Sequence, residues 1–363
     1  MLASAMEVTG SRYVGEAGAI NYIGSELKLL DRKKAYILGG RRALGVALPQ
    51  IESSLKDEGI QYEVDVFEGY CTYDNAERYA QRMLAAGCDC LVGVGGGKCM
   101  DTSKIVSKLT GMPLGMIPTQ LATCVSCTNM AIVYENSGAY LEACHPDKAI
   151  AFILADFELL VKSPSRYTAS GIVDAMAKYP ELNFTQRGDY DCTDVDDAAA
   201  QAARAMASCT WNLYLTNGRE AYADNKAGII SNTFTSIANT NLVTTGVISG
   251  LARGSKQLAI AHSLYNNSTT VYPEVWRNYL HGEIVSVGVV LQQYYNDAPE
   301  AEIKEYISIA KDLDAPVCLR DLGLKGTAEE LDSMHKAIIK DFDNFGEKEA
   351  KRLRELMERI VAI

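Results

Sequence analysis

Short apolar runs alternate with longer amphipathic stretches along the first 160 residues. A periodicity of about 3.6 residues predicts helices near 42–57, 74–86 and 98–109, and Gly111 ends the last of them. The runs of strand length lie at 34–39, 62–67, 90–94, 113–118, 131–134 and 149–154. Alternating apolar strands and helices are typical of a largely parallel sheet covered on both faces. We therefore predict an α/β domain over residues 1–160.

The pattern changes beyond about residue 162, where Ser163-Pro164 is typical of a helix start. Long helical periodicities follow, with few strand signals, at 194–216, 281–296, 299–312 and 347–361. We expect an all-helical domain over residues 161–363, packed closely on the first because no low-complexity linker separates them. A cleft between two packed domains is the default position for a ligand site.

Charge and composition exclude several partners. The net charge of −11 and the absence of any basic run longer than Arg41-Arg42 or Lys33-Lys34 argue against nucleic acid and anionic membranes. The first fifteen residues lack the features of a signal peptide, and no apolar run has the length of a membrane span. We expect a cytoplasmic homo-oligomer that acts on a small molecule.

The ten cysteines are scattered, and the only CxxC, Cys124 to Cys127, lacks a second pair. A redox or metal pair is one interpretation of this CxxC. We favour reduced, structural thiols, which are typical of a reducing compartment.

One stretch, LVGVGGGKCMDTSK at 91–104, places glycines between a strand and a helix. Gly95, Gly96 and Gly97 allow close approach of a ligand to the backbone, and the helix that follows directs free N–H groups to the same place. A diphosphate fits such a turn, although the pattern is neither G-x-G-x-x-G nor the P-loop. A glycine-rich turn without a ligand is the alternative. Asp101 is predicted in the first helical turn, either as a helix-start residue or as a ligand contact.

Four histidines occur, and two have unusual surroundings. His262 lies in an apolar helix, His281 directly precedes one, and Asp174 lies among small apolar residues. Singly, each is more often a core or capping residue. Together, two imidazoles and a carboxylate would be satisfied by one divalent metal that keeps an open position. The spacing does not show that they converge. We assign no role to His145 and His335.

Five motifs in order identify a resemblance. They are Gly93-Val-Gly-Gly-Gly-Lys-x-x-Asp101-Thr-x-Lys104, Ile117-Pro118-Thr119, Gly171-x-x-Asp174-Ala, Ala261-His262-x-x-x-Asn266 and His281-Gly282-Glu283. The set resembles the glycerol dehydrogenase branch of the iron-containing (group III) alcohol dehydrogenase superfamily, over roughly residues 10–320. The resemblance implies the dehydroquinate synthase-like fold, with an N-terminal Rossmann-like α/β domain and an all-α C-terminal domain.

The resemblance also implies a function and a site. NAD or NADP would exchange hydride with a small alcohol, a polyol or a 2-hydroxy/2-oxo acid. Gly95, Gly96, Gly97, Lys98 and Asp101 would bind the diphosphate, and the ribose and nicotinamide would lie against Thr119, Ala122, Thr128, Met130 and Tyr134. Asp174, His262 and His281 would hold one divalent metal, zinc rather than iron, because Lys178 replaces the further histidine of the iron-dependent relatives.

Several positions depart from this pattern. Cys124 replaces an aspartate near the polyol, which favours a less hydroxylated or acidic substrate, and with Cys71 it resembles the hydroxycarboxylate dehydrogenase relatives. Tyr265 replaces a second histidine, so its hydroxyl or a water would have to relay protons. Tyr179-Pro180-Glu181 should break a helix. Arg41 ends a strand where relatives carry an acid, which favours NADP at least as much as NAD.

Two alternatives remain open at this point. Tyr265 and Cys124 suit a catalytically altered relative that binds dinucleotide as a sensor or scaffold. A dehydroquinate synthase-like lyase is disfavoured, because the chain lacks that enzyme's run of substrate-binding lysines and arginines.

Overall fold

The computed structural model describes residues 10–146, 148–185, 191–253 and 258–363. The start of the segment used to argue against a signal peptide, residues 1–9, lies outside the described residues. Within the described ranges, no helix combines the length and apolarity that crossing a membrane requires.

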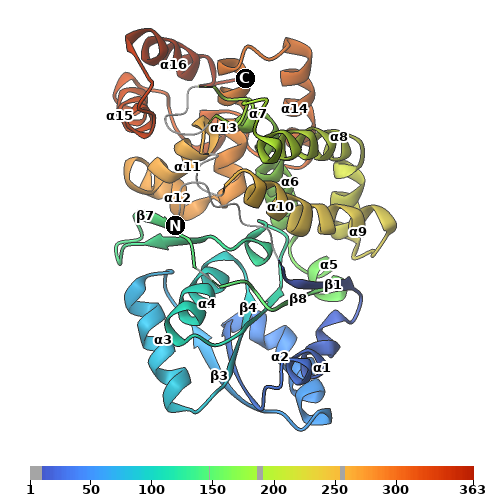
Figure 1. Cartoon of the computed structure of the whole chain (residues 1–363). Coiled ribbons are helices and arrows are strands. Elements are labelled where there is room, and N and C mark those ends of the chain that lie inside the picture. Colours follow the sequence, from blue (N-terminus) through green and yellow to red (C-terminus); the bar gives the residue numbers. More distant parts are fainter. Residues whose placement is uncertain (1–9, 147, 186–190, 254–257) are drawn as a thin grey trace.

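A parallel six-stranded sheet forms the lower half of the molecule in Figure 1, with strand order β1-β8-β5-β4-β2-β3. All of its strand pairs are parallel. The central strands β4 and β5 are buried along their whole length, as sequences apolar on both faces should be. The strands are β1 (Arg12–Glu16), β2 (Lys34–Gly40), β3 (Gln61–Phe67), β4 (Cys90–Gly95), β5 (Leu114–Pro118) and β8 (Phe152–Asp156).

Helices cover both faces of this sheet, which confirms the predicted α/β class (Figure 1). Because successive strand residues point to opposite faces, Ile37 packs with α1 and α2, whereas Leu38 packs with α3 and α4. The three helices predicted in this half match α2 (Arg41–Asp57), α3 (Tyr73–Ala85) and α4 (Gly97–Thr110) to within about a residue at each end. The structure adds α1 (Ile23–Leu29), which was not predicted, and a 3₁₀ turn at Ala19–Tyr22.

Two strands were not predicted, and one prediction placed a strand in the wrong sheet. β1 is an edge strand that is only half-buried, and β7 (Tyr140–Cys144) is largely exposed, so neither has a clear apolar run. The predicted strand at 131–134 is β6 (Ala131–Tyr134), which pairs antiparallel with β7 outside the main sheet. This hairpin contacts α4 on one side and α11 on the other (Figure 1).

From Phe157 onward, helices account for all the regular structure in the described residues. At their centre α13 is buried almost throughout and packs against α6 and α11, because Gly282 and Gly288 admit the neighbouring backbones closely. The division into two domains at residue 160 remains a prediction. The helices are α5 (Phe157–Val161), α6 (Ser165–Met176), α7 (Lys178–Leu182), α8 (Ala198–Ala227), α9 (Asn232–Asn239), α10 (Thr245–Leu251), α11 (Ile260–Val271), α12 (Pro273–Asn278), α13 (His281–Tyr295), α14 (Glu300–Asp312), α15 (Ala328–Ile338) and α16 (Glu347–Arg359). Shorter turns of 3₁₀ or π type lie at Val125–Cys127, Thr240–Thr244, Leu319–Leu322 and Ile339–Asp341.

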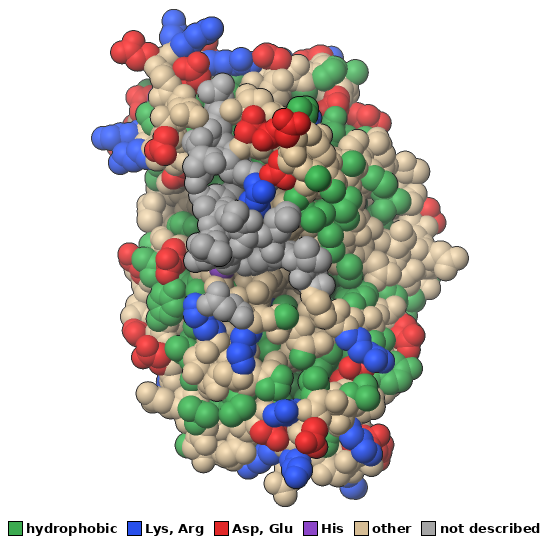
Figure 2. All heavy atoms as spheres, viewed as in Figure 1, with side chains coloured by type: hydrophobic (Ala, Val, Ile, Leu, Met, Phe, Trp, Pro, Cys, Tyr) green, Lys and Arg blue, Asp and Glu red, His purple; other side chains and the backbone are tan. Residues whose placement is uncertain are grey.

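Charged side chains of both signs are interspersed over the described part of the face drawn in Figure 2. No large basic patch gathers on that part of the face, in keeping with the net charge of −11.

Candidate active site

A cavity of about 610 Å³ lies where the sheet meets the helical half. Residues at or just after the carboxyl ends of four strands line it on one side, namely Gly40, Phe67, Gly96 and Gln120. Residues of α11, α12 and α13 line the other side. The carboxyl edge of a parallel sheet is the usual ligand position in such folds.

The glycine turn forms one end of this cavity. Gly95 ends β4 with φ +149°, a conformation that other residues rarely adopt, and a Cβ on Gly96 would collide with the Gln120 side chain. Gly97 begins α4 beside open space, and within the described part of the chain no side chain caps the helix. The first N–H groups of α4 are therefore free to bind an anion such as a diphosphate. Gly96, Gly97 and Lys98 line the cavity, whereas Gly95 belongs to the same turn but does not line it.

Asp101 corrects one prediction. Because α4 begins at Gly97, Asp101 lies beyond its first turn, so the helix-start interpretation is wrong. Its buried carboxylate pairs with Lys104 Nζ at 3.0 Å and accepts the Ile132 N–H at 3.2 Å. Burial raises the pKa of Asp101, and the charge of Lys104 opposes that rise.

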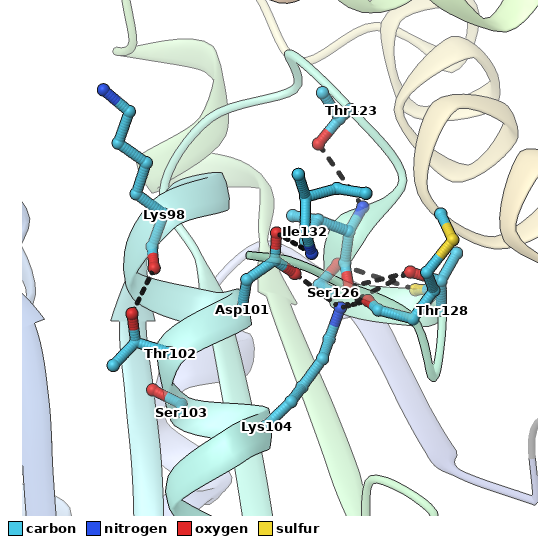
Figure 3. A network of polar contacts seen from close by, with 12 residues as sticks. Lys98, Asp101, Thr102, Ser103, Lys104, Thr123, Ser126, Thr128 and Ile132 are labelled. Carbon is cyan, nitrogen blue, oxygen red and sulfur yellow. Dashed lines mark hydrogen bonds and ion pairs between the residues drawn. The ribbon is translucent and has the colours of Figure 1, made fainter. Parts of the chain in front are cut away.

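Lys104 extends this contact into a network, which Figure 3 shows between α4 and the loop before β6. Its ammonium donates to the Met130 carbonyl at 2.6 Å and to Thr128 Oγ1 at 3.4 Å. Asp101 and Lys104 thus hold in place the loop that carries Thr128 and Met130.

The other predicted cofactor residues divide into two sets. Ala122, Thr128, Met130 and Tyr134 all line the cavity, as does Asp101. Thr119 does not line it, and its N–H instead donates to the Gly95 carbonyl at 3.1 Å, next to the glycine turn.

Arg41 lies outside the cavity lining and forms an exposed ion pair with Glu68, 2.9 Å from Nη2 to Oε1. Gly40 at the end of β2 pairs with Phe67 at the end of β3, so the next residues, Arg41 and Glu68, lie side by side. The segment around Arg41 contains no acid, as the sequence shows, but Glu68 directly after β3 places a carboxylate beside it. The local sequence around Arg41 does not reveal this neighbour.

The three predicted metal ligands come together from α6, α11 and α13 at the cavity wall. Their ligand atoms lie within 4.8 Å of one another. His281 Nε2 is 3.1 Å and His262 Nε2 is 3.4 Å from Asp174 Oδ1. Among the described residues, this is the one such group of three.

The chemistry of these three side chains fits a divalent metal. Asp174 Oδ1 is buried and makes no hydrogen bond within the described residues, although both imidazoles lie close to it. Burial raises the pKa of Asp174, but the charges of His281 and His262 outweigh burial and hold it well below its usual range. An ionised, unsatisfied oxygen facing two imidazole nitrogens is an arrangement that a cation with three protein ligands would complete.

Glu181 orients one of these ligands, a role that the sequence did not reveal. It is fully buried in α7, and its Oε2 lies 2.6 Å from His262 Nδ1, while Oε1 accepts the His262 backbone N–H at 3.0 Å. A carboxylate at Nδ1 leaves Nε2 to face Asp174, as the outer partners of metal-bound histidines do. Burial lowers the pKa of His262, but the charge of Glu181 raises it to about 9. Metal binding would therefore release a proton.

The predicted helix break places Glu181 in this position. Pro180 has no N–H to donate to Met176, where α6 ends, and α7 starts at Lys178. Pro180 indicated the helix break from the sequence, whereas nothing in the sequence indicated that Glu181 would contact His262.

Tyr265 contacts a metal ligand through its ring. The ring lies edge-on to His281 with centroids 4.0 Å apart. Its hydroxyl accepts from Trp276 Nε1 at 3.2 Å and lies 3.3 Å from the Tyr134 hydroxyl. Burial raises the pKa of Tyr265, so the phenol stays neutral at neutral pH. Its predicted proton relay would run along the Tyr134 hydroxyl, and it remains a prediction.

Cys124 lines the cavity but lies outside the group of three ligands. Burial raises the pKa of its thiol to about 11, against the opposing charge of Lys178, so the thiol is protonated at neutral pH. In its predicted catalytic role, Cys124 would therefore contact the substrate as a neutral thiol and not as a thiolate. All ten cysteines are free, in agreement with the expectation of reduced thiols.

Sequence reasoning assigned no ligand contact to several cavity residues, among them Tyr70, Lys178 and Trp276. The Tyr70 and Trp276 rings contact each other at a tilt with centroids 5.5 Å apart, and Lys98 Nζ lies 4.4 Å from the Tyr70 ring centroid. Lys178 was noted only as the replacement for a histidine. His145 and His335 do not line the cavity.

Comparisons with known proteins agree with this geometry. Residues 10–156 match the iron-containing alcohol dehydrogenase family. Glycerol dehydrogenase of Escherichia coli O6:H1 is 28% identical over 86% of this chain and 83% of the relative. Hydroxycarboxylate dehydrogenase A of Escherichia coli K12 is 24% identical over 78% of this chain and 75% of the relative. A probable glycerol dehydrogenase structure from Sinorhizobium meliloti covers 98% of both chains with a TM-score of 0.83 at 24% identity.

The parallel sheet, the helical half and the cavity between them have the architecture of the group III alcohol dehydrogenases. Within that class, the chain is similar to the glycerol dehydrogenase branch of the iron-containing alcohol dehydrogenase superfamily.

Proposed function

We propose that the chain is a metal-dependent NAD(P) oxidoreductase that transfers hydride between nicotinamide and a small alcohol, polyol or 2-hydroxy/2-oxo acid. One observation carries this proposal. The open helix start at Gly97 and the Asp174–His262–His281 group line the same cavity. A dinucleotide anchored at the first would reach the second across the cavity.

The residues of the chain have separate parts in this reaction. A divalent metal held by Asp174, His262 and His281 would supply Lewis-acid activation of the substrate oxygen. The α4 N-terminus binds the diphosphate, and the loop held by Lys104 orients the nicotinamide end. The aromatic side chains of Tyr134, Tyr265 and Trp276 exclude water from that wall of the cavity.

We propose that both NAD and NADP are used. Arg41 can bind a 2′-phosphate, and Glu68 can accept ribose hydroxyls. Both side chains of this ion pair are exposed to solvent, so breaking the pair costs little free energy and either side chain can contact the cofactor instead.

Zinc is the metal we propose, because three protein ligands are present and Lys178 takes the place of the further histidine found in iron-dependent relatives. A cytoplasmic homo-oligomer is proposed on the ground of composition alone.

The test is a nicotinamide absorbance screen of small alcohols, diols and 2-oxo acids, with both cofactors and with zinc or iron restored. About one metal per chain and turnover with at least one substrate would support the proposal. Asp174→Asn should remove both metal and turnover. A protein that binds dinucleotide but no metal would favour the sensor or scaffold instead.

A further inference from the structure

Lys178 is a buried cation in the active-site cavity. Its side chain belongs to the first residue of α7, is 6% exposed and lines the cavity with Asp174 and His262. Within the described residues, its ammonium makes no hydrogen bond or ion pair. Lys104, buried to a similar degree, has Asp101, Thr128 and Met130 as partners. The Lys178 side chain is largely buried, but its ammonium nitrogen is not a fully buried atom and opens to the cavity, where it can meet an acceptor on a ligand.

The acidic and thiol groups around Lys178 do not satisfy it. Both carboxylate oxygens of Glu181 bond to His262. Asp174 faces the two imidazoles. The charge of Lys178 acts on Glu181, on His262 and on the Cys124 thiol, and the thiol stays protonated. Among the described residues, the cavity wall therefore combines an ammonium that forms no ion pair with a metal-binding group.

We propose that Lys178 binds the carboxylate of a 2-hydroxy or 2-oxo acid whose adjacent oxygen lies at the Asp174–His262–His281 group. This inference rests on the proposed function and narrows its substrate class. In such acids the reacting carbon and the carboxylate are directly bonded, so two neighbouring cationic positions would hold both groups. Cys124, which replaces the acid of the polyol-binding pattern, puts no negative charge beside the carboxylate.

A matched pair of substrates isolates the charge. Pyruvate and hydroxyacetone are both three-carbon ketones, and only pyruvate carries a carboxylate. In Lys178→Met, kcat/KM for pyruvate is expected to fall by about 10- to 100-fold, mainly through KM, because a hydrogen bond to a charged group is lost. The value for hydroxyacetone should change little, and Lys178→Arg should restore part of the loss.

Two further measurements keep the test independent of turnover. Calorimetry with oxamate, an unreactive carboxylate, should show a comparable loss of affinity in metal-loaded Lys178→Met. The metal content of each variant is measured alongside, so that loss of metal is not mistaken for loss of the lysine contact. As a control, Lys98→Met removes the other lysine expected at the ligand. It should weaken cofactor binding while leaving the ratio of pyruvate to hydroxyacetone activity unchanged.

The outcomes separate this inference from the proposed function. Equal effects of Lys178→Met on both substrates, or unchanged oxamate affinity, would overturn the inference even if the protein is an active oxidoreductase. Absence of turnover with every substrate, together with oxamate binding that depends on Lys178, would refute the proposed function and support the anion site.

Discussion

Glu181→Gln is the substitution that most directly tests how the chain prepares its metal ligands. The carboxylate uses both oxygens, one on the His262 backbone N–H and one on Nδ1. A carboxamide can still accept the backbone N–H through its oxygen, but it then presents its NH₂ group to Nδ1. Nδ1 must become an acceptor, and the ring proton moves to Nε2, the atom that faces Asp174. The variant therefore favours the tautomer that cannot bind a metal.

The expected magnitude follows from this geometry. Loss of such an outer partner typically lowers metal affinity by about 10- to 100-fold, which corresponds to about 1.4–2.7 kcal/mol. The full effect is expected here because Glu181 is completely buried and no water can replace it easily.

Competition between the protein and a chromophoric zinc chelator at neutral pH measures the affinity. Glu26→Gln is the matched control, since Glu26 is also a buried carboxylate, paired with Arg12 in the α/β half. Zinc affinity should fall in Glu181→Gln and remain unchanged in Glu26→Gln. Undiminished affinity in Glu181→Gln would refute the orienting role, and an equal loss in both variants would point to general destabilisation.

Three further substitutions test other parts of the structure. Lys104→Met should lower the free energy of unfolding by about 3–5 kcal/mol by leaving Asp101 buried and unpaired; denaturant melts measure this, and adding Asp101→Asn should recover part of it. Glu68→Gln should raise the ratio of NADPH to NADH activity, since a negative charge beside Arg41 repels the 2′-phosphate; an unchanged ratio would exclude this pair from cofactor choice. Asp197 caps α8 through the Ala199 and Ala200 N–H groups, and these bonds lower its pKa. Its contribution is complete above about pH 4 and is lost as the pH falls through the folded-state pKa, so thermal melts of Asp197→Asn should show a weaker loss of stability with acid than the parent.

Local patterns in the sequence determined most of the secondary structure and half of the site. Apolar runs and helical periodicity depend on neighbours within a few residues, so the sequence alone places β4, α4 and the glycine turn between them. The same locality explains the omission of β1 and β7, whose exposed or half-buried residues have no apolar pattern. Asp174, His262 and His281 were selected only as residue types that are costly to bury alone, supported by the resemblance.

Contacts between distant segments decided the rest. Packing of α13 against α6 and α11 brings the three ligands to one point, and the proline break between α6 and α7 turns Glu181 onto His262. Strand register puts Glu68 beside Arg41, where the sequence around Arg41 shows no acid. Lys178 is an ordinary lysine in the sequence, and only the folded chain buries it in the cavity wall, where it forms no ion pair with the described residues. Hydrophobic periodicity reports which face of an element is buried, whereas side-chain partners depend on the separation and orientation of elements that only tertiary packing sets.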